Sequence, residues 1–168
     1  QSVGQLPLYY NCLNTGRPVG EGADRYLNFT SNYIDVRNDA LYPFGYGLSY
    51  TTFDISTSAA AENQVAKDKS FDLTLNVKNT GKRDGTEVVQ VYISKDGDTE
   101  GAPIKTLRAF QRVDVKAGKT AKATLTLTPE AFEFYDEASM KVCTTPGTYT
   151  VFYGNSSANV KSIKVTLQ

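Results

Sequence analysis

The chain has 168 residues, and its 18 Lys and Arg residues balance its 18 Asp and Glu residues, so that the formal net charge is zero. A neutral chain supplies no excess positive field, and we therefore expect neither nucleic acid nor a membrane as a partner. No apolar run approaches the roughly 20 residues that cross a bilayer, and the length suits one domain with a substantial extra segment. The sequence contains no histidine, which excludes Ser-His-Asp and Cys-His nucleophilic sites and histidine-ligated zinc.

The first 50 residues lack the regularity of an independent domain. The stretch VGQLPLYY, from Val3 to Tyr10, has the apolar composition of a strand. Residues 11–39 are polar, rich in Gly and Asn, and without a helical or strand period, which is typical of a connector. The sequence opens without an initiator Met, and we expect the chain to be a piece of a longer protein.

The stretch LYPFGYGLSYTTF, residues 41–53, places five large side chains at every second position. Gly45 and Gly47 match the opening of a G-x-G-x-x-G phosphate loop. A tyrosine occupies the third glycine position and strand residues follow, so that a dinucleotide site is not expected. The large side chains fall on even positions, whereas the next strand has its inner face on odd positions from Phe53 onward. Because a slip of one residue exchanges the two faces of a strand, the chain must bulge or turn near residues 50–52.

From Phe53 onward the pattern is all-β. Apolar and polar residues alternate over 71–78, and residues 88–93 carry large side chains on both faces, which indicates a central strand covered on both sides. The other predicted strands are 53–59, 107–115, 121–127, 149–153 and 163–167. Seven strands at this spacing predict an immunoglobulin-like two-sheet sandwich with an irregular N-terminal extension. The absence of Trp favours the fibronectin type III-like variety.

A helical turn is predicted between the fifth and sixth of these strands, in TPEAFEFYDEAS. Thr128 is the expected N-cap, Pro129 the first helical residue, and Glu130 lies beside the positive end of the helix dipole. The stretch offers the pair of carboxylates that glycoside hydrolysis requires, although on a short capping helix such groups are more simply a solvated face. The other carboxylates of the stretch are Glu133, Asp136 and Glu137.

Two further sets of residues are candidate sites. Asp96, Asp98 and Glu100 alternate as in part of a calcium loop, but the twelve-residue EF-hand pattern is absent and a solvated hairpin tip is the simpler interpretation. Cys12 and Cys143 show no metal-ligand spacing, and we expect both to be unpaired. No residue is therefore assigned to catalysis, to a cofactor or to a metal.

Several segments of the chain resemble one enzyme family. The first pair is GQLPLYYNCLNTGRP followed by ALYPFGYGLSYTTF, and the later ones are VKNTGKRDGTEVVQVYIS, LRAFQRVDVKAGKT and PGTYTVFYGNSS. These segments resemble the C-terminal region of bacterial family 3 glycoside hydrolases of the periplasmic β-glucosidase type. The resemblance implies that residues 1–50 are the end of an α/β sandwich domain plus a connector, and that residues 51–168 are a fibronectin type III-like domain. No position matches the family's nucleophile or acid/base motif.

The resemblance also implies a function. The chain would be a non-catalytic C-terminal accessory domain of a periplasmic or secreted β-glucosidase that hydrolyses terminal non-reducing β-D-glucosyl residues with retention. Its partners would be the catalytic barrel and the α/β sandwich domain of the same parent chain and, through the parent, an oligo- or disaccharide substrate. The signal peptide would lie outside this piece. The alternative is an autonomous carbohydrate-binding module, in which exposed Tyr side chains stack on sugar rings.

In this interpretation the segment 41–50 is an interdomain clasp. Aromatic side chains on one side anchor it, and glycines on the other allow a second backbone to approach. The predicted interdomain packing residues are Arg17, Tyr42, Pro43, Phe44, Gly45, Tyr46, Gly47, Leu48 and Tyr50. The strand expected from Val3 to Tyr10 has lost its parent sheet, and we expect it to dock on its own sandwich or to pair with another copy of the chain.

Overall fold

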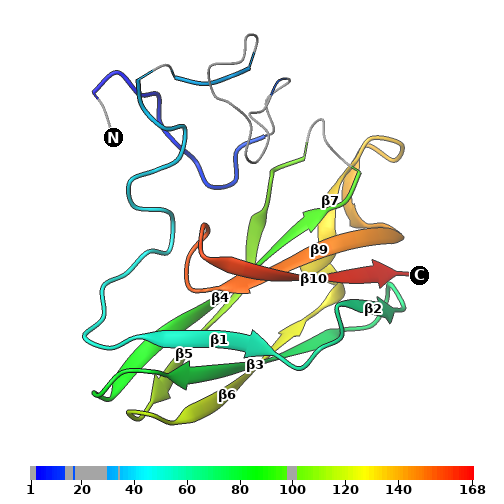
Figure 1. Ribbon diagram of the computed structural model, residues 1–168. Coiled ribbons are helices and arrows are strands. Elements are labelled where there is room, and N and C mark those ends of the chain that lie inside the picture. The colour runs from blue at the N-terminus through cyan, green and yellow to red at the C-terminus, as the bar shows by residue number, and fades with distance from the viewer. Residues whose placement is uncertain (1–2, 14–16, 18–29, 34, 98–101) are drawn as a thin grey trace.

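The computed structural model shows a sandwich of two β-sheets (Figure 1). It describes residues 3–13, 17, 30–33, 35–97 and 102–168. The elements are β1 (Phe53–Thr57), β2 (Glu62–Val65), β3 (Phe71–Asn79), β4 (Gly85–Lys95), β5 (Thr106–Val115), β6 (Thr120–Leu127), the 3-10 helix η1 (Pro129–Phe132), β7 (Glu133–Asp136), β8 (Lys141–Thr144), β9 (Gly147–Gly154) and β10 (Val160–Leu167). One sheet has the order β1-β3-β6, the other β2-β10-β9-β4-β5, and β7 and β8 form a hairpin. The predicted all-β sandwich is confirmed.

Alternate side chains of both sheets form one core. On β3, Leu73, Leu75 and Val77 are fully buried. In the pairing of β1 with β3, Ile55 lies opposite Val77, and Phe53 packs against the same cluster. The odd-numbered inner face predicted for the first strand is therefore correct. The other large members of the core include Val89, Val91, Ile93, Val113, Leu125, Leu127, Tyr149, Val151, Ile163 and Val165.

Strand β4 is buried on both faces, as its sequence predicts. Val89, Val91 and Ile93 face the core. On the opposite face Gln90 is 5% exposed and Tyr92 is fully buried. Because the second face of β4 points out of the sandwich, residues from outside the two sheets must cover it.

The described residues form ten strands rather than the predicted seven. β2 carries the sequence ENQV, which has no apolar alternation. It forms a strand because it pairs in parallel with β10. The strands β7 and β8 pair with each other in antiparallel register. Only β7 lies in the stretch for which a helical turn is predicted, and β8 follows that stretch. Both differences arise from hydrogen bonding between strands, which no local pattern reveals.

The predicted helical turn is shorter than expected. Its helical part is η1, which begins at Pro129 as predicted, but the side chain of Thr128 makes no capping hydrogen bond to the helix backbone. The Thr128 hydroxyl instead bonds to Glu130 and lowers the pKa of that carboxyl. No helix in the described part of the chain is long and apolar enough to cross a bilayer.

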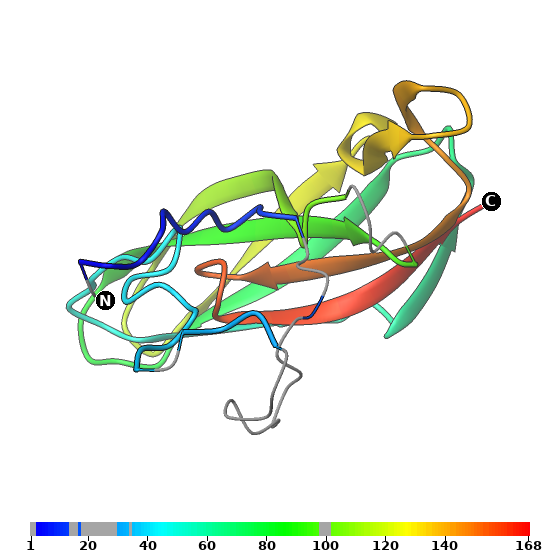
Figure 2. The ribbon, with the colours of Figure 1, turned by 90° about the horizontal axis from the view of Figure 1, so that it is seen from above.

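The prediction of a strand from Val3 to Tyr10 is wrong. The described residues before Cys12 form no strand, and most of their large apolar side chains are exposed. The nearest ladder contact is an isolated bridge between Leu13 and Pro103. The segment nevertheless contacts its own sandwich, since the Cys12 carbonyl accepts a hydrogen bond from the Ile104 amide at 2.9 Å. Figure 2 shows this segment as an irregular coil, which is expected where the chain has no neighbouring strand with which to pair.

Candidate interdomain surface

The stretch of residues 41–53, called the aromatic segment below, contains a tight turn at residues 43–46. The Tyr46 amide donates to the Pro43 carbonyl at 3.0 Å, and Gly45 has a φ of 79°. A positive φ at the third residue is the requirement of a type II turn, and it favours glycine. A Cβ at Gly45 would lie 2.0 Å from Oε1 of Gln90. Glycine is therefore needed at this position both for the backbone angle and for the close approach of Gln90.

Two buried polar side chains of β4 hold the turn in place. The Tyr92 hydroxyl donates to Oε1 of Gln90. Nε2 of Gln90 donates to the Gly45 carbonyl at 3.1 Å and to the Asn155 carbonyl at 2.9 Å. Because an unsatisfied buried polar group costs about 1–3 kcal/mol, this network ties the aromatic segment to β4 and to the loop that follows β9.

Three aromatic rings meet at the outer face of β4, and one of them, Tyr92, belongs to this strand. The ring of Tyr10 stacks on Phe44 with centroids 4.1 Å apart, and it meets the ring of Tyr92 edge-on at 5.7 Å. Such pairs contribute about 0.5–1.5 kcal/mol each beyond their buried area. Burial, with Tyr10 nearby, raises the pKa of Tyr92 to about 12. The N-terminal segment, the aromatic segment and the sandwich therefore meet at one cluster.

Replacing Tyr92 with Phe should make the stability of the chain less sensitive to high pH. The folded chain holds the Tyr92 proton up to about pH 12, whereas the unfolded chain releases it near pH 10. The stabilising contribution of the hydroxyl is therefore complete below pH 10 and is lost as the pH rises from 10 to 12. Urea unfolding of both proteins across this interval measures the effect. Near neutral pH we expect the free energy of unfolding of wild type to be about 1–3 kcal/mol larger than that of Tyr92→Phe. A difference between the two proteins that stays constant up to pH 12 would contradict the prediction.

The loop after β9 forms a second support for the aromatic segment. The Ser157 amide donates to the Phe44 carbonyl at 2.8 Å, and the Lys105 ammonium donates to the Ser157 carbonyl. Lys105 also lies over the ring of Phe152, with Nζ 5.4 Å from the ring centroid. Burial lowers the pKa of Lys105. The loop is thus held by a half-buried cation that directly precedes β5.

The far end of the aromatic segment is anchored at the end of β3. Oγ1 of Thr51 donates to Oδ1 of Asn79 at 2.7 Å, and the amide that follows Asn79 donates to the Thr52 carbonyl at 2.8 Å. Asn79 is fully buried, and its Nδ2 donates to the carbonyls of Arg83 and Val115 at 2.8 and 3.0 Å. The chain bends at 50–51 before β1 begins, which confirms the turn that the change of phase predicted.

Between its two anchors the segment is exposed to solvent. Leu48 and Tyr50 are 90% and 93% exposed, and Tyr46 is 49% exposed with its ring 5.4 Å from that of Tyr42. Nothing lies within 4 Å of a Cβ placed at Gly47. Contiguous exposed apolar side chains are typical of interaction surfaces. We define the clasp surface as Leu41, Tyr42, Phe44, Tyr46, Leu48 and Tyr50.

A hollow of about 500 Å³ lies beside the clasp surface. One side is formed by residues 45–49 and 51–53, and the other by residues 86–88 of β4 together with residues of the loop after β9. In the hollow Oε2 of Glu87 accepts from Nδ2 of Asn155 at 3.1 Å, and Oε1 accepts from the Val88 amide at 2.9 Å. The hollow therefore combines an apolar rim with one half-buried carboxylate.

The structure brings most of the predicted packing residues together and adds others. The residues predicted between 42 and 50 form one segment, whereas Arg17 is exposed and its carbonyl accepts from Ser31 at 2.8 Å. The close neighbour of Gly45 is a side chain, not the backbone that was expected. Gln90 and Asn79 are anchors that the sequence analysis missed. The amide side chain of Gln90, within an otherwise apolar strand, was the available signal.

Two carboxylates of the predicted helical stretch, Glu130 and Asp136, do not have the property that a glycosidase general acid requires. The Ser139 hydroxyl and amide lower the pKa of Asp136, and the pKa of Glu130 is lowered as described above. A glycosidase general acid requires a raised pKa, so that it still holds a proton near neutral pH. Glu130 and Asp136 therefore agree with the simpler interpretation, which is a solvated face of charged residues.

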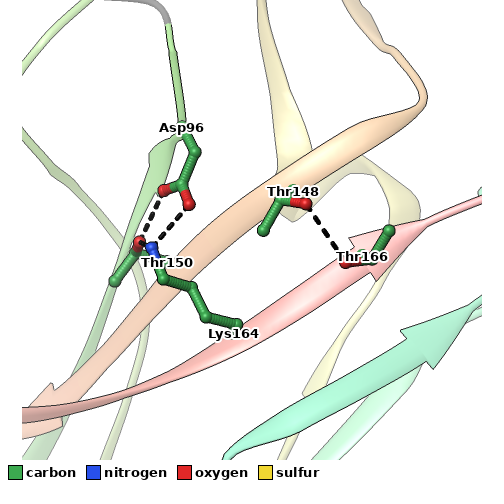
Figure 3. Close-up of polar contacts among 5 residues, drawn as sticks. All are labelled: Asp96, Thr148, Thr150, Lys164 and Thr166. Atoms are coloured by element: carbon green, nitrogen blue, oxygen red, sulfur yellow. Dashed lines mark hydrogen bonds and ion pairs between the residues drawn. The ribbon is translucent and has the colours of Figure 1, made fainter.

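Asp96 pairs with a cation of its own chain. Its Oδ1 accepts from Oγ1 of Thr150 at 2.6 Å, and its Oδ2 forms an ion pair with Lys164 (Figure 3). Asp98 and Glu100 lie outside the described residues. Within the described ranges, no group of three or more His, Cys, Asp or Glu is arranged to hold a metal ion. The two cysteines are free.

The fold and the sequence together define a class of domain. Residues 87–157 match the family model of the fibronectin type III-like domain. This match spans β4 to the loop after β9, which includes the strand that anchors the clasp surface. The chain therefore contains a fibronectin type III-like domain.

The relatives of the chain are family 3 glycoside hydrolases, and the chain matches their C-terminal region. It is 39% identical over 161 residues to the periplasmic β-glucosidase of Salmonella typhimurium, covering 96% of this chain and 21% of the relative. It is 45% identical over 166 residues to the xylan 1,4-β-xylosidase of Xylanibacter ruminicola, covering 97% and 17%. The structure is similar to the β-glucosidase from Listeria innocua in complex with glucose, with a TM-score of 0.87 and 37% identity over 98% of this chain and 22% of that one. The chain thus spans about a fifth of the length of these relatives.

Proposed function

We propose that the chain is the non-catalytic C-terminal accessory domain of a β-glucosidase that hydrolyses terminal non-reducing β-D-glucosyl residues. Support comes from relatives that are named β-glucosidases or β-xylosidases and that are about five times longer than this chain. The parent enzyme is periplasmic or secreted, by analogy with the Salmonella relative. In this proposal residues 51–168 are the domain itself, and residues 1–50 are the end of the preceding α/β domain plus the connector.

The clasp surface is proposed to pack against the other domains of the parent chain. The observation that carries this proposal is its combination of fixed ends and exposed side chains. Gln90 bonds to the Gly45 carbonyl, and Asn79 bonds to the Thr51 side chain. Between these anchors Leu48 and Tyr50 remain almost fully exposed. A segment held in this way loses less backbone entropy when it associates, which favours binding.

Amide hydrogen exchange and activity assays on two proteins test the proposal. The full-length enzyme and the 168-residue chain are compared. We expect the amides of residues 47–50 to exchange roughly tenfold or more slowly in the full-length enzyme, because neighbouring domains cover them. Amides of β6 provide the internal reference. The full-length enzyme should hydrolyse an aryl β-glucoside, and the isolated chain should not. Equal exchange at 47–50 in the two proteins would contradict the clasp, and turnover by the isolated chain would contradict its non-catalytic role.

A further inference from the structure

We propose that the hollow beside the clasp surface receives a cationic side chain, Arg or Lys, from a neighbouring domain of the parent enzyme, and that the Glu87 carboxylate binds it. This inference rests on the proposed function, because it names the group that the neighbouring domain inserts. Its evidence is the charge of Glu87, the arrangement of the amides around it and the apolar rim of the hollow.

The charge of Glu87 is not balanced by its known neighbours. Its two oxygens accept hydrogen bonds from the Val88 amide and from Nδ2 of Asn155, which are both neutral donors. In the part of the chain that the structure describes, no Lys or Arg forms an ion pair with this carboxylate. A carboxylate accepts about four hydrogen bonds, and further burial at a domain junction would be unfavourable without a cation. A positive partner satisfies both requirements.

The amides beside Glu87 are already engaged. Nδ2 of Asn159 donates to Oδ1 of Asn155 at 2.8 Å, and Nδ2 of Asn155 in turn donates to Glu87. The backbone amide of Asn155 also donates to the backbone carbonyl of Asn159 at 3.3 Å. These bonds orient the carboxylate before any partner arrives. They leave the negative charge of Glu87 without a cation, and charge-assisted hydrogen bonds from Arg or Lys are stronger than those from neutral donors.

The rim of the hollow suits the stem of a long side chain. Tyr46, Leu48 and Phe53 line it together with Glu87, so that apolar groups stand beside a negative charge. Lys and Arg pack their methylene stems along apolar surface while their charged heads reach a polar partner. A volume of about 500 Å³ admits such a side chain. Leu48 belongs to the clasp surface, and insertion here would therefore be continuous with the proposed domain junction.

Hydrogen exchange of the full-length enzyme carrying Glu87→Gln tests the inference. Gln retains an oxygen that can accept from Asn155 but removes the charge. We expect the amides of residues 47–50 to exchange roughly tenfold faster in this variant than in the wild-type enzyme, because the inserted cation loses its partner. The increase should shrink at high salt, where the ion pair is already weakened. The same substitution in the isolated chain should leave exchange at 47–50 unchanged.

Two controls separate the outcomes. Glu62→Gln removes a carboxylate of β2 that lies outside the hollow, and it should leave exchange at 47–50 as in wild type. If the wild-type enzyme protects these amides but Glu87→Gln exchanges at the same rate, the cation site is refuted while the clasp stands. If the wild-type enzyme does not protect them, the proposed function itself fails. Titration of the isolated chain with cellobiose should give no saturable amide shifts at Glu87 or Asn155, and saturable shifts there would assign the hollow to a sugar and overturn the inference.

Discussion

Replacing Gly45 with Val is expected to lower the free energy of unfolding of the 168-residue chain by about 3 kcal/mol. A β-branched residue at a φ of 79° is strained by about 1–3 kcal/mol. The new Cβ would also lie 2.0 Å from Oε1 of Gln90, so that Gln90 must move and lose buried hydrogen bonds worth about 1–3 kcal/mol. Urea unfolding at neutral pH measures the loss.

Gly47→Val is the matched control for this substitution. Gly47 lies two residues away, has no positive φ, and has open space around its Cβ position. We expect its unfolding free energy in the isolated chain to stay within about 0.5 kcal/mol of wild type. Equal losses for the two valine variants would mean that the turn is not held by Gln90 in the way the structure shows.

Replacing Asn79 with Ala should destabilise the chain by about 3–4 kcal/mol. The side chain is fully buried, it donates to the carbonyls of Arg83 and Val115, and it accepts from the Thr51 hydroxyl and the Gly81 amide. Alanine leaves several of these groups without a partner, each at a cost of about 1–3 kcal/mol. Water can bond to the groups that lie near the surface, so the total loss of stability is smaller than the sum of the individual costs. Thermal and urea unfolding of the variant measure the loss.

The same strand provides a control for the Asn79 prediction. Asn76 lies on β3 with its side chain on the outward face of the sheet. Its neighbours in the strand, Leu75 and Val77, point to the inner face and are buried. Asn76→Ala should change the unfolding free energy by about 0.5 kcal/mol or less. If Asn79→Ala proves as mild as Asn76→Ala, the buried amide does not anchor the aromatic segment. In that case exchange of amides 47–50 in the isolated chain would also be unaffected by Asn79→Ala.

Residues whose neighbours lie far along the chain could not be predicted from the sequence. The Gln90 side chain donates hydrogen bonds to the carbonyls of Gly45 and Asn155, which are 45 and 65 residues away. The Asn79 side chain accepts a hydrogen bond from the hydroxyl of Thr51, which is 28 residues away. Both pairings depend on how two sheets and two loops meet, so no local spacing contains them. The parallel pairing of β2 with β10 escaped prediction for the same reason.

What the sequence by itself determined was the burial of each long strand and the place of the aromatic segment. The alternation through Leu73, Leu75 and Val77, and the two-sided β4, follow from the period of two that every strand imposes on its side chains. The same period required a change of phase near residue 51. The tertiary structure alone decided what holds that segment and leaves Leu48 and Tyr50 exposed. The hydrogen-bond partners of the segment come together only when strands that are distant in the sequence pair in their final register. The exposure of Leu48 and Tyr50 then depends on which surfaces the folded chain leaves uncovered.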